Sequence, residues 1–459
     1  MERVQAFRAR LGDSLFPDPP APRPTFGRSE QVVLLLSLLA LAVFLQLARA
    51  GWSGSIHALW AEDGPIFLQE AVREGFWHAI SSTYAGYLVV VPRLIAEVAG
   101  ILPLRAAPAA ISISSAAVVA LSGLAVWHAS SGHIRNPYLR GTLAILAILV
   151  PVASLESVDS AAYVAWYMLF ATFWLLLWRP RTNWGAALGS LFILATALSS
   201  PGVWFFIPLA ILRALTVRDG RDLAIIGSFA IGAAIQVPVV ALNTEEAVTP
   251  LWTSDIWPLY IQRVVDGAAF GQRLGGAAWA RLGWAFLIPL LAATAAGLVI
   301  SAVRSSRGPR YFVAIAALTS LAMFVVSVYQ RAVGTAMLWP VGSYNGTGGR
   351  YTIVPALLLI SAALVLIDAS WRRRPRPGRL SPAGFAAVGL LLLGMVVSFD
   401  VRDPATRGEP PWDRKLDEAA VVCARERSAE VIVPISPPGF GVQLPCDDLG
   451  PVAKAPGRR

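Results

Sequence analysis

Long runs of apolar residues alternate with short polar segments along most of the chain. A bilayer-spanning helix needs about 20 predominantly apolar residues. Several runs approach that length: Gln31–Ala48, Ala107–Trp127, Leu223–Leu242, Trp284–Val303, Tyr311–Tyr329, Thr352–Ile367 and Pro382–Phe399. Shorter apolar runs lie between them. The pattern predicts an all-α polytopic membrane protein.

The composition agrees with this prediction. Of the 459 residues, 56% are hydrophobic and 14% are charged, whereas soluble domains carry about 25% charged residues. The net charge of +10 does not indicate nucleic-acid binding, because nearly all the cations are arginines and many lie in short loops between apolar runs. There they report membrane orientation. We therefore expect a lipid bilayer, and no nucleic acid, as a partner.

The arginines concentrate in alternate loops and so predict a topology. The groups are Arg3–Arg28, Arg135 with Arg140, Arg179 with Arg181, Arg213–Arg221, Arg304–Arg310 and Arg372–Arg379. If all of them face the cytosol of a plasma membrane, the positive-inside rule is met with about eleven spans, the N-terminus inside and the C-terminus outside. The chain then divides into a loosely ordered cytosolic tail (1–30), a transmembrane domain (31–399, first outer loop 51–106) and an extracytoplasmic appendage (400–459).

One apolar segment, Tyr87–Leu102, contains Pro92, Arg93 and Glu97. We interpret it as a helix lying in the outer interface, because counting it as a span would place the Arg135/Arg140 loop outside. The alternative is an ordinary transmembrane helix with a buried Arg93–Glu97 pair at i,i+4.

Both cysteines, Cys423 and Cys446, lie in the predicted appendage. An outer compartment is where disulfides persist, so we expect these two residues to be joined. The appendage also contains a polar helical pattern over Trp412–Ser428 and a strand pattern over Glu430–Ile435. With so little core, it would depend on the disulfide for stability.

Two acidic pairs fall in the predicted outer loops. Glu62 and Asp63 open an amphipathic stretch in the first loop, which predicts a helix on the membrane surface. Asp63, followed by Gly64 and Pro65, also fits a helix N-cap. Glu156 and Asp159 are three residues apart, so on a helical turn they would face one side; the alternative is a solvated loop.

A glycine-rich stretch, Gly342–Pro355, contains Arg350, which lies at the mouth of a predicted span. An arginine at the membrane surface suits bidentate capture of a phosphate, but it can equally anchor a helix among headgroups. Arg93 has the same two interpretations. The sequence has no Walker loop and no GxSxG, and its four histidines lack metal-ligand spacing.

Over roughly Gln31–Leu215 this layout resembles the GT-C superfamily of membrane glycosyltransferases, which includes protein O-mannosyltransferases and aminoarabinose transferases. The resemblance rests on the first span, the acidic start of the outer loop at Glu62-Asp63, the stretch YAGYLVVVPRLIA, the basic loop HIRNPYLR and the second acidic loop ESVDS. The pattern ALSSPGVWFFIPLAILRAL also looks like this family's module.

The resemblance implies transfer of a sugar from a polyprenyl phosphate to a hydroxyl of a glycan, lipid or protein on the outer face. Asp63 would be the base, with Glu62 as its rival, and Asp159 or Glu156 the second-loop carboxylate. Arg350, and less directly Arg93, would hold the lipid phosphate. One-step displacement would invert the anomeric centre. No cofactor is certain, and a divalent cation on the outer carboxylates stays open.

Two other functions remain open on the sequence alone. A transporter or flippase would need polar groups within its spans, and Gln236 with Pro238 is the nearest to such a site. A catalytically silent GT-C-like scaffold could instead bind a partner through its C-terminal tail.

Overall fold

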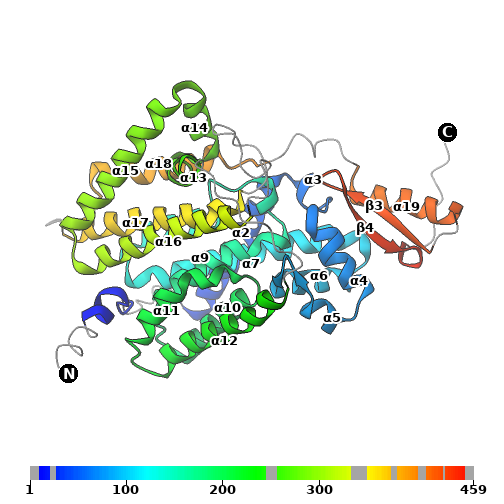
Figure 1. Cartoon of the computed structure of the whole chain (residues 1–459), viewed down its shortest axis with the longest axis horizontal. Helices are drawn as coiled ribbons and strands as arrows, with labels where there is room; N and C mark the ends of the chain where they lie inside the picture. Colours follow the sequence, from blue (N-terminus) through cyan, green and yellow to red (C-terminus); the bar gives the residue numbers. More distant parts are fainter. Residues whose placement is uncertain are drawn as a thin grey trace.

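The computed structural model describes residues 10–20, 27–243, 256–331, 349–373, 380–401, 410–426 and 429–449. Most of the glycine-rich stretch before Gly349, and most of the basic segment 372–379, lie outside the described residues. The molecule is a bundle of helices with a small appendage at one end of its long axis (Figure 1).

Within the described residues, six helices are long and apolar enough to cross a membrane. They are α2 (Arg28–Ala50), α7 (Ala107–Ala129), α12 (Gly220–Leu242), α15 (Trp284–Arg304), α16 (Arg307–Arg331) and α17 (Arg350–Arg372). Five shorter apolar helical segments accompany them: α8 (Pro137–Ile148), α9 (Val164–Leu177), α10 (Asn183–Ala197), η7 with α11 (Pro201–Phe206, Ile207–Ala214) and α18 (Pro382–Val397). Each corresponds to one of the predicted apolar runs. The all-α polytopic prediction is confirmed.

Several helices begin where the sequence supplies a capping side chain. Asn136 accepts hydrogen bonds from the backbone N–H groups of Tyr138 and Leu139 and is followed by Pro137 at the first helical position. Thr182, Asp219 and Ser381 cap α10, α12 and α18 in the same way. Such caps satisfy backbone donors that a helix leaves unpaired at its start.

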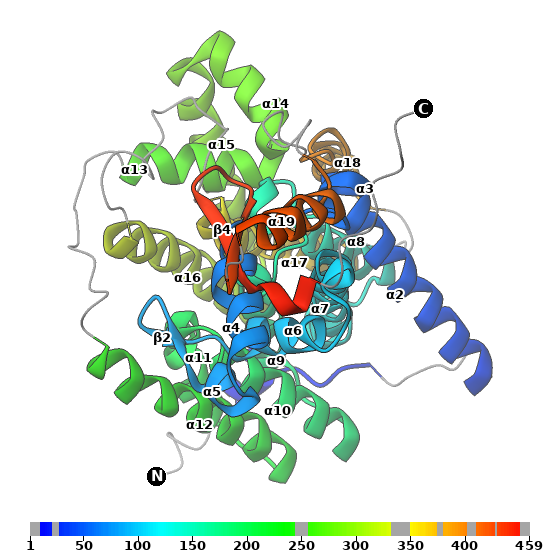
Figure 2. The same cartoon turned by 90° about the vertical axis from the view of Figure 1, so that its right-hand side faces the viewer.

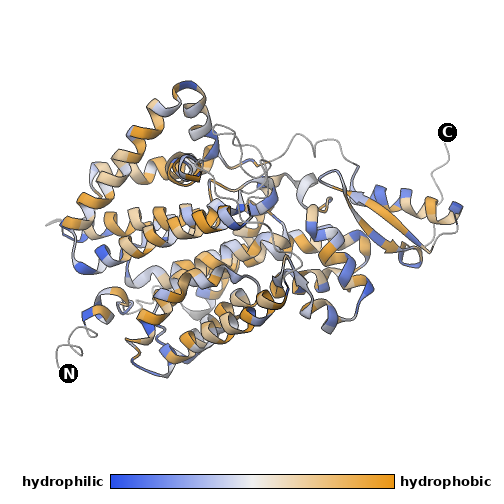
Figure 3. Ribbon diagram, viewed as in Figure 1, coloured by the Kyte–Doolittle hydropathy of each residue, from blue (hydrophilic) through white to orange (hydrophobic). Residues whose placement is uncertain are grey.

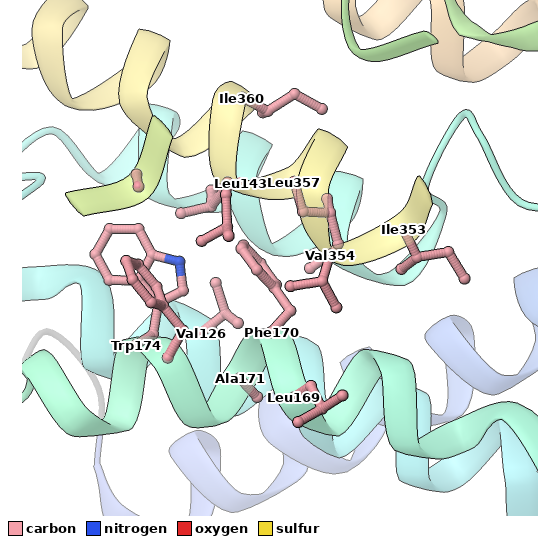
Figure 4. Packing of buried hydrophobic residues seen from close by; sticks show 14 of the residues in the cluster. Val126, Leu143, Leu169, Phe170, Ala171, Trp174, Ile353, Val354, Leu357 and Ile360 are labelled. Carbon is pink, nitrogen blue, oxygen red and sulfur yellow. The ribbon is translucent and has the colours of Figure 1, made fainter. Parts of the chain in front are cut away.

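The core of the bundle lies around α9 and α17. Nearly every side chain of α9 is buried, as expected for a helix that is apolar on all sides. Phe170 and Trp174 of α9 pack among Val126, Leu143 and Leu357, which come from α7, α8 and α17 (Figure 4). This packing holds the first residues of α9 and α17 side by side, and the candidate site forms there.

The outer helices have the opposite character. Only 11% of the apolar window of α2 and 6% of that of α15 is buried, and α2 runs along the edge of the bundle (Figure 2). Exposed apolar surface on this scale marks a face that another apolar medium covers, which agrees with a membrane protein. Hydrophobic residues predominate along the bundle helices, while the appendage is richer in hydrophilic ones (Figure 3).

Residues 10–20 pack against the end of the bundle farther from the appendage. Leu15 and Phe16 are fully buried. The backbone of Pro17 presses on Gly132, that of Ser14 on Gly308, and the carbonyl of Leu15 is bonded to His133 Nε2 at 3.1 Å. The expectation of a loosely ordered tail is therefore wrong for these residues, because two large apolar side chains anchor them.

The segment after the first span folds into short elements rather than one surface helix. These are α3 (Trp52–Ser55), η1 (Ala61–Asp63), η2 (Gly64–Leu68), α4 (Gln69–Arg73), α5 (Phe76–Ser81), β1 (Thr83–Tyr84), β2 (Tyr87–Leu88), α6 (Val90–Gly100) and η3 (Leu104–Ala106). Phe67 is buried whereas Trp77 is 81% exposed. The apolar positions predicted to share one helix side are therefore divided between the core and the surface.

Helix α6 has 11 residues, a length of about 16 Å, too short to cross a bilayer. Arg93 is 1% exposed and pairs with Glu70. The alternative of a full span with an Arg93–Glu97 pair is wrong, because α4 supplies the partner. The location of α6 in the membrane interface stays a prediction.

The appendage consists of α19 (Trp412–Glu426), the antiparallel strands β3 (Glu430–Ile435) and β4 (Phe440–Pro445), and η11 (Cys446–Leu449). The strands pair from Glu430 opposite Pro445 to Ile435 opposite Phe440. A disulfide joins Cys423 to Cys446. The apolar side chains of the appendage share one cluster with Leu59, Leu68 and Ile95, so the appendage and the first loop bury their apolar surface together.

Candidate active site

Three segments meet where the bundle joins the appendage: η1, the loop before α9, and the first residues of α17. The carboxylate of Glu62, which is half-buried, accepts hydrogen bonds from the hydroxyl groups of Tyr84 at 2.9 Å and Tyr163 at 2.7 Å. The Tyr163 oxygen in turn accepts a hydrogen bond from Arg350 Nη1 at 3.1 Å. A carboxylate and a guanidinium are therefore connected through a single phenol.

Arg350 opens α17 and also binds Glu156. Its Nη1 lies 3.3 Å from one carboxylate oxygen of Glu156, and its backbone N–H donates to the other oxygen at 3.3 Å. Nη2 donates to the Tyr351 hydroxyl at 3.4 Å, and the guanidinium lies over the rings of Tyr163 and Tyr351. A guanidinium has five N–H donors, so these contacts do not use all of them. The Arg350 side chain is 16% exposed.

Asp63, adjacent to Glu62, has a different environment. It is 2% exposed, and its carboxylate accepts the backbone N–H groups of Ala161 at 3.2 Å and Ala162 at 3.0 Å. It therefore caps the helical turn η6 (Ala161–Tyr163), which leads into α9. Asp63 does cap a helical element, as predicted, but not the one that follows it. It makes no capping bond to its own helix and instead caps a turn 98 residues away. Burial raises the pKa of Asp63 to about 7, against the lowering effect of the two backbone donors.

Asp159 is separated from Glu156 although only two residues lie between them. Its backbone has φ +60°, which turns the chain out of a helical path. Its carboxylate is 2.6 Å from Ser55 Oγ, whereas Glu156 binds Arg350. The expectation that the pair shares one side of a helical turn is wrong, because the positive φ sends the two carboxyl groups to different partners.

The hydrogen bonding of Asp159 suits a neutral carboxyl group. Ser55 Oγ lies 2.9 Å from the carbonyl of Leu47 as well as 2.6 Å from Asp159, and one hydroxyl proton cannot serve both acceptors. When Asp159 is protonated, its carboxyl group can donate to Ser55 Oγ, which leaves the serine proton for the carbonyl of Leu47. Burial raises the pKa of Asp159 to about 7, which agrees with this arrangement.

Arg93 lies within the first loop itself. Besides Glu70 it contacts the carbonyl of Thr83 at 3.4 Å and lies over the ring of Phe67, 5.7 Å from its centroid. These contacts secure α6 to α4 and β1. The structure therefore brings Glu62, Glu156 and Arg350 into one network and gives Arg93, Asp63 and Asp159 partners elsewhere.

The three tyrosines of the network, Tyr84, Tyr163 and Tyr351, have no feature in the sequence that marks them as site residues. Tyr84 belongs to the YAGY stretch and Tyr163 ends SLESVDSAAY, so both lie in segments that had drawn attention for other residues. Tyrosine is common at membrane interfaces, and composition alone would not have separated these residues from the rest. They are distant from Glu62 in sequence, and only the fold brings them close to it.

The last glycine of the glycine-rich stretch, Gly349, packs against the second acidic loop. A Cβ atom on Gly349 would lie 2.5 Å from Ser154 Oγ. A side chain at this position would push the start of α17 away from the acidic loop that carries Glu156. Gly349 therefore permits the close approach that the Arg350–Glu156 contact requires.

Gln236 is a structural residue. It is fully buried, accepts the backbone N–H of Leu88 at 3.1 Å, and donates to the carbonyls of Leu88 and Ala197 at 3.1 Å each. These bonds attach β2 to α12 and α10. The polar group that a transporter interpretation relied on is thus occupied by backbone partners.

Among the described residues there is no group of three or more His, Cys, Asp or Glu side chains that could hold a metal ion. An open cleft on the first loop has polar walls contributed by Glu70, Glu74, His78 and Ser81–Thr83. A divalent cation remains an open prediction.

Neither the known family models nor the curated proteins contain a match to the chain. Among solved structures, the chain is similar to the oligosaccharyltransferase of Archaeoglobus fulgidus, crystallised in complex with Zn and sulfate. The two are 14% identical, with a TM-score of 0.34 over 84% of this chain and 55% of that one. The chain therefore spans about half the length of that protein.

Proposed function

We propose that the chain is a membrane glycosyltransferase that moves a sugar from a polyprenyl phosphate to a hydroxyl acceptor. The observation that supports this most is the network of Glu62, Tyr163, Arg350 and Glu156, which places a reachable carboxylate and a reachable guanidinium on either side of one phenol. Glycosyl transfer needs a base for the acceptor and a cation for the leaving phosphate, and this cluster contains both.

Within the acidic pair, the geometry favours Glu62 as the base. Glu62 is half-buried and is held by two phenols, whereas Asp63 is 2% exposed and has both oxygens committed to backbone N–H groups. A general base must come within hydrogen-bond reach of the acceptor hydroxyl. Asp63, Asp159 and Arg93 are then supporting residues that hold the loops in place.

In the proposed step the acceptor oxygen attacks the anomeric carbon as Glu62 removes its proton. The bond from that carbon to the phosphate oxygen breaks, and the phosphate keeps the electron pair. Arg350, using donors beyond those given to Glu156 and the tyrosines, stabilises the charge that develops on the phosphate. A single displacement inverts the anomeric centre.

The remaining expectations belong to the same proposal. The appendage end of the bundle faces outward from a plasma membrane, the donor enters laterally from the bilayer, and the acceptor is a glycan, lipid or protein. The transporter alternative loses its clearest site because Gln236 is bound to backbone. The scaffold alternative predicts that function survives the loss of every outer-loop carboxylate.

The test is donor turnover by the purified protein in nanodiscs. Radiolabelled polyprenyl-phosphate hexose and pentose are the donors, and a cell-envelope extract supplies acceptors. We expect Glu62→Gln to lower turnover at least about 100-fold, as for loss of a general base. Asp63→Asn is the matched control, and we expect it to change thermal stability more than turnover. Wild-type turnover in Glu62→Gln would refute the assignment, and donor flux in proteoliposomes without chemical change would favour a transporter.

A further inference from the structure

The C-terminal appendage contacts the acidic motif on both flanks. On the N-terminal side, the backbone N–H of Ala61 donates to the carbonyl of Ser436 at 2.6 Å, at the end of β3. On the C-terminal side, Gly64 packs so closely that a Cβ there would lie 2.5 Å from Ile435 Cδ1 and 2.7 Å from Val442 Cγ2. Glu62 and Asp63 thus lie between two contacts made by one hairpin.

Further contacts secure this hairpin to the rest of the first loop. The Gln443 backbone N–H donates to the side chain of Gln69 at 2.7 Å, and Arg73 pairs with Glu430 at 2.8 Å. Trp412 is buried. Its indole N–H donates to the carbonyl of Leu104, and its backbone N–H donates to the carbonyl of His57, each at 2.8 Å. The appendage therefore holds the loop near its beginning, middle and end.

We infer that the appendage is part of the candidate site and acts as a clamp that positions Glu62. The motif is a short 3₁₀ turn, η1, that continues directly into η2, and such a turn has little stability of its own. The hairpin supplies the missing constraint through the Ala61 bond and the Gly64 contact. The claim about order in the loop stands on these contacts alone, and only its consequence for turnover rests on the proposed function.

Gly64 allows a local test of this clamp. Its backbone has φ −84° and ψ −75°, so an alanine is not excluded by conformation, and the space between Ile435 and Val442 is the obstacle. Gly64→Ala should separate the motif from the hairpin. Two side-chain atoms block the added Cβ, so the rescue removes both in the same chain: Ile435→Val removes Cδ1 and Val442→Ala removes Cγ2, and together they should restore the contact. Gly75→Ala is the matched control, since a Cβ there would meet nothing within 4 Å.

The measurements are hydrogen exchange of residues 59–69 in nanodiscs and, in parallel, kcat and KM for the polyprenyl-phosphate donor. We expect Gly64→Ala to speed exchange in 59–69 and to lower kcat, each about tenfold, with exchange in α17 and KM unchanged. Adding Ile435→Val together with Val442→Ala should recover most of both effects. Gly75→Ala should behave as wild type.

A second arm uses the wild-type chain. Reduction of the Cys423–Cys446 disulfide should loosen α19 against η11 and speed exchange in 59–69 as well as in the appendage. If Gly64→Ala leaves 59–69 protected, if Ile435→Val with Val442→Ala restores nothing, or if reduction loosens the appendage alone, the clamp is refuted. If exchange changes and recovers as expected while turnover does not follow, the clamp stands and the catalytic role of Glu62 is refuted.

Discussion

Two arginines, Arg213 and Arg350, show how differently this molecule treats charge at its two ends. Arg213 is 1% exposed, and its guanidinium binds the carbonyls of Leu175 and Leu176 and the carboxylate of Asp222 at 2.8 Å. Phe16 covers it. Arg350 is 16% exposed and binds phenols and a carboxylate that continue to half-buried Glu62.

The difference separates a structural ion pair from a candidate site. Both arginines are shielded and both have an acidic partner, so burial and pairing alone do not distinguish them. At Arg213 the partners are backbone carbonyls and a carboxylate that is itself 3% exposed, and the cluster is closed. At Arg350 the partners form a chain that ends at a reachable carboxylate, where a ligand can join.

The largest expected effect comes from opening the closed cluster. Arg213→Met leaves Asp222 buried with Arg179 at 3.4 Å as its remaining basic side chain. Removing one partner of a buried ion pair costs about 3–5 kcal/mol, and we expect a loss of stability of this size. Thermal unfolding in detergent measures it, with Arg350→Met as the comparison. Equal losses in the two variants would contradict the distinction between the ends.

How far could the sequence alone lead to this structure? The helices follow from local pattern, because apolar runs of sufficient length and the capping residues Asn136, Thr182, Asp219 and Ser381 act over a few residues. The carboxylates and Arg350 were identified because charged residues are rare in such a chain. These inferences needed no knowledge of which segments meet.

What the sequence could not reveal depends on contacts between distant segments. Asp63 fits a cap for the helix that follows it, but tertiary packing offers it the unpaired N–H groups of η6 instead. Arg93 fits an i,i+4 partner in Glu97, but α4 brings Glu70 to it. The positive φ of Asp159 and the contact of Gly64 with the hairpin have no local signature either.

A smaller effect should appear in the pH dependence of stability. The folded pKa of Asp159 is about 7 and its reference value is 3.8. Between these values the folded chain binds the proton more tightly than the unfolded chain, so this group's contribution to the free energy of unfolding is full below pH 4 and is lost as the pH rises towards 7. Asn cannot ionise. As the pH rises from 4 to 7, the free energy of unfolding of Asp159→Asn should therefore increase relative to that of wild type, by up to about 4 kcal/mol.

The unfolding temperatures of both proteins, measured in detergent at several pH values, test this expectation. A difference between Asp159→Asn and wild type that stays constant from pH 4 to pH 7 would contradict a raised pKa in the folded state. Asp63→Asn should show a pH trend of the same sign, offset by the weaker capping of η6.

The smallest expected effect tests the link within the network. Tyr163→Phe removes the hydroxyl between Glu62 and Arg350 and should lower turnover about tenfold, as for one hydrogen bond to a charged group, with little change in unfolding temperature. Tyr167→Phe is the control, because its hydroxyl donates to the Ser157 carbonyl at 3.0 Å, outside this chain of contacts. If Tyr167→Phe lowers turnover as much as Tyr163→Phe, the link has no special role.

The most direct test of the central claim is the affinity of the protein for a polyprenyl phosphate. Binding of undecaprenyl phosphate to wild type and to Arg350→Gln can be compared in nanodiscs by native mass spectrometry. Arg105→Gln is the control, since this half-exposed arginine pairs with Asp417 of the appendage. We predict at least about tenfold weaker binding in Arg350→Gln and unchanged binding in Arg105→Gln. Equal affinity in wild type and Arg350→Gln would contradict the assignment of this site to a lipid phosphate.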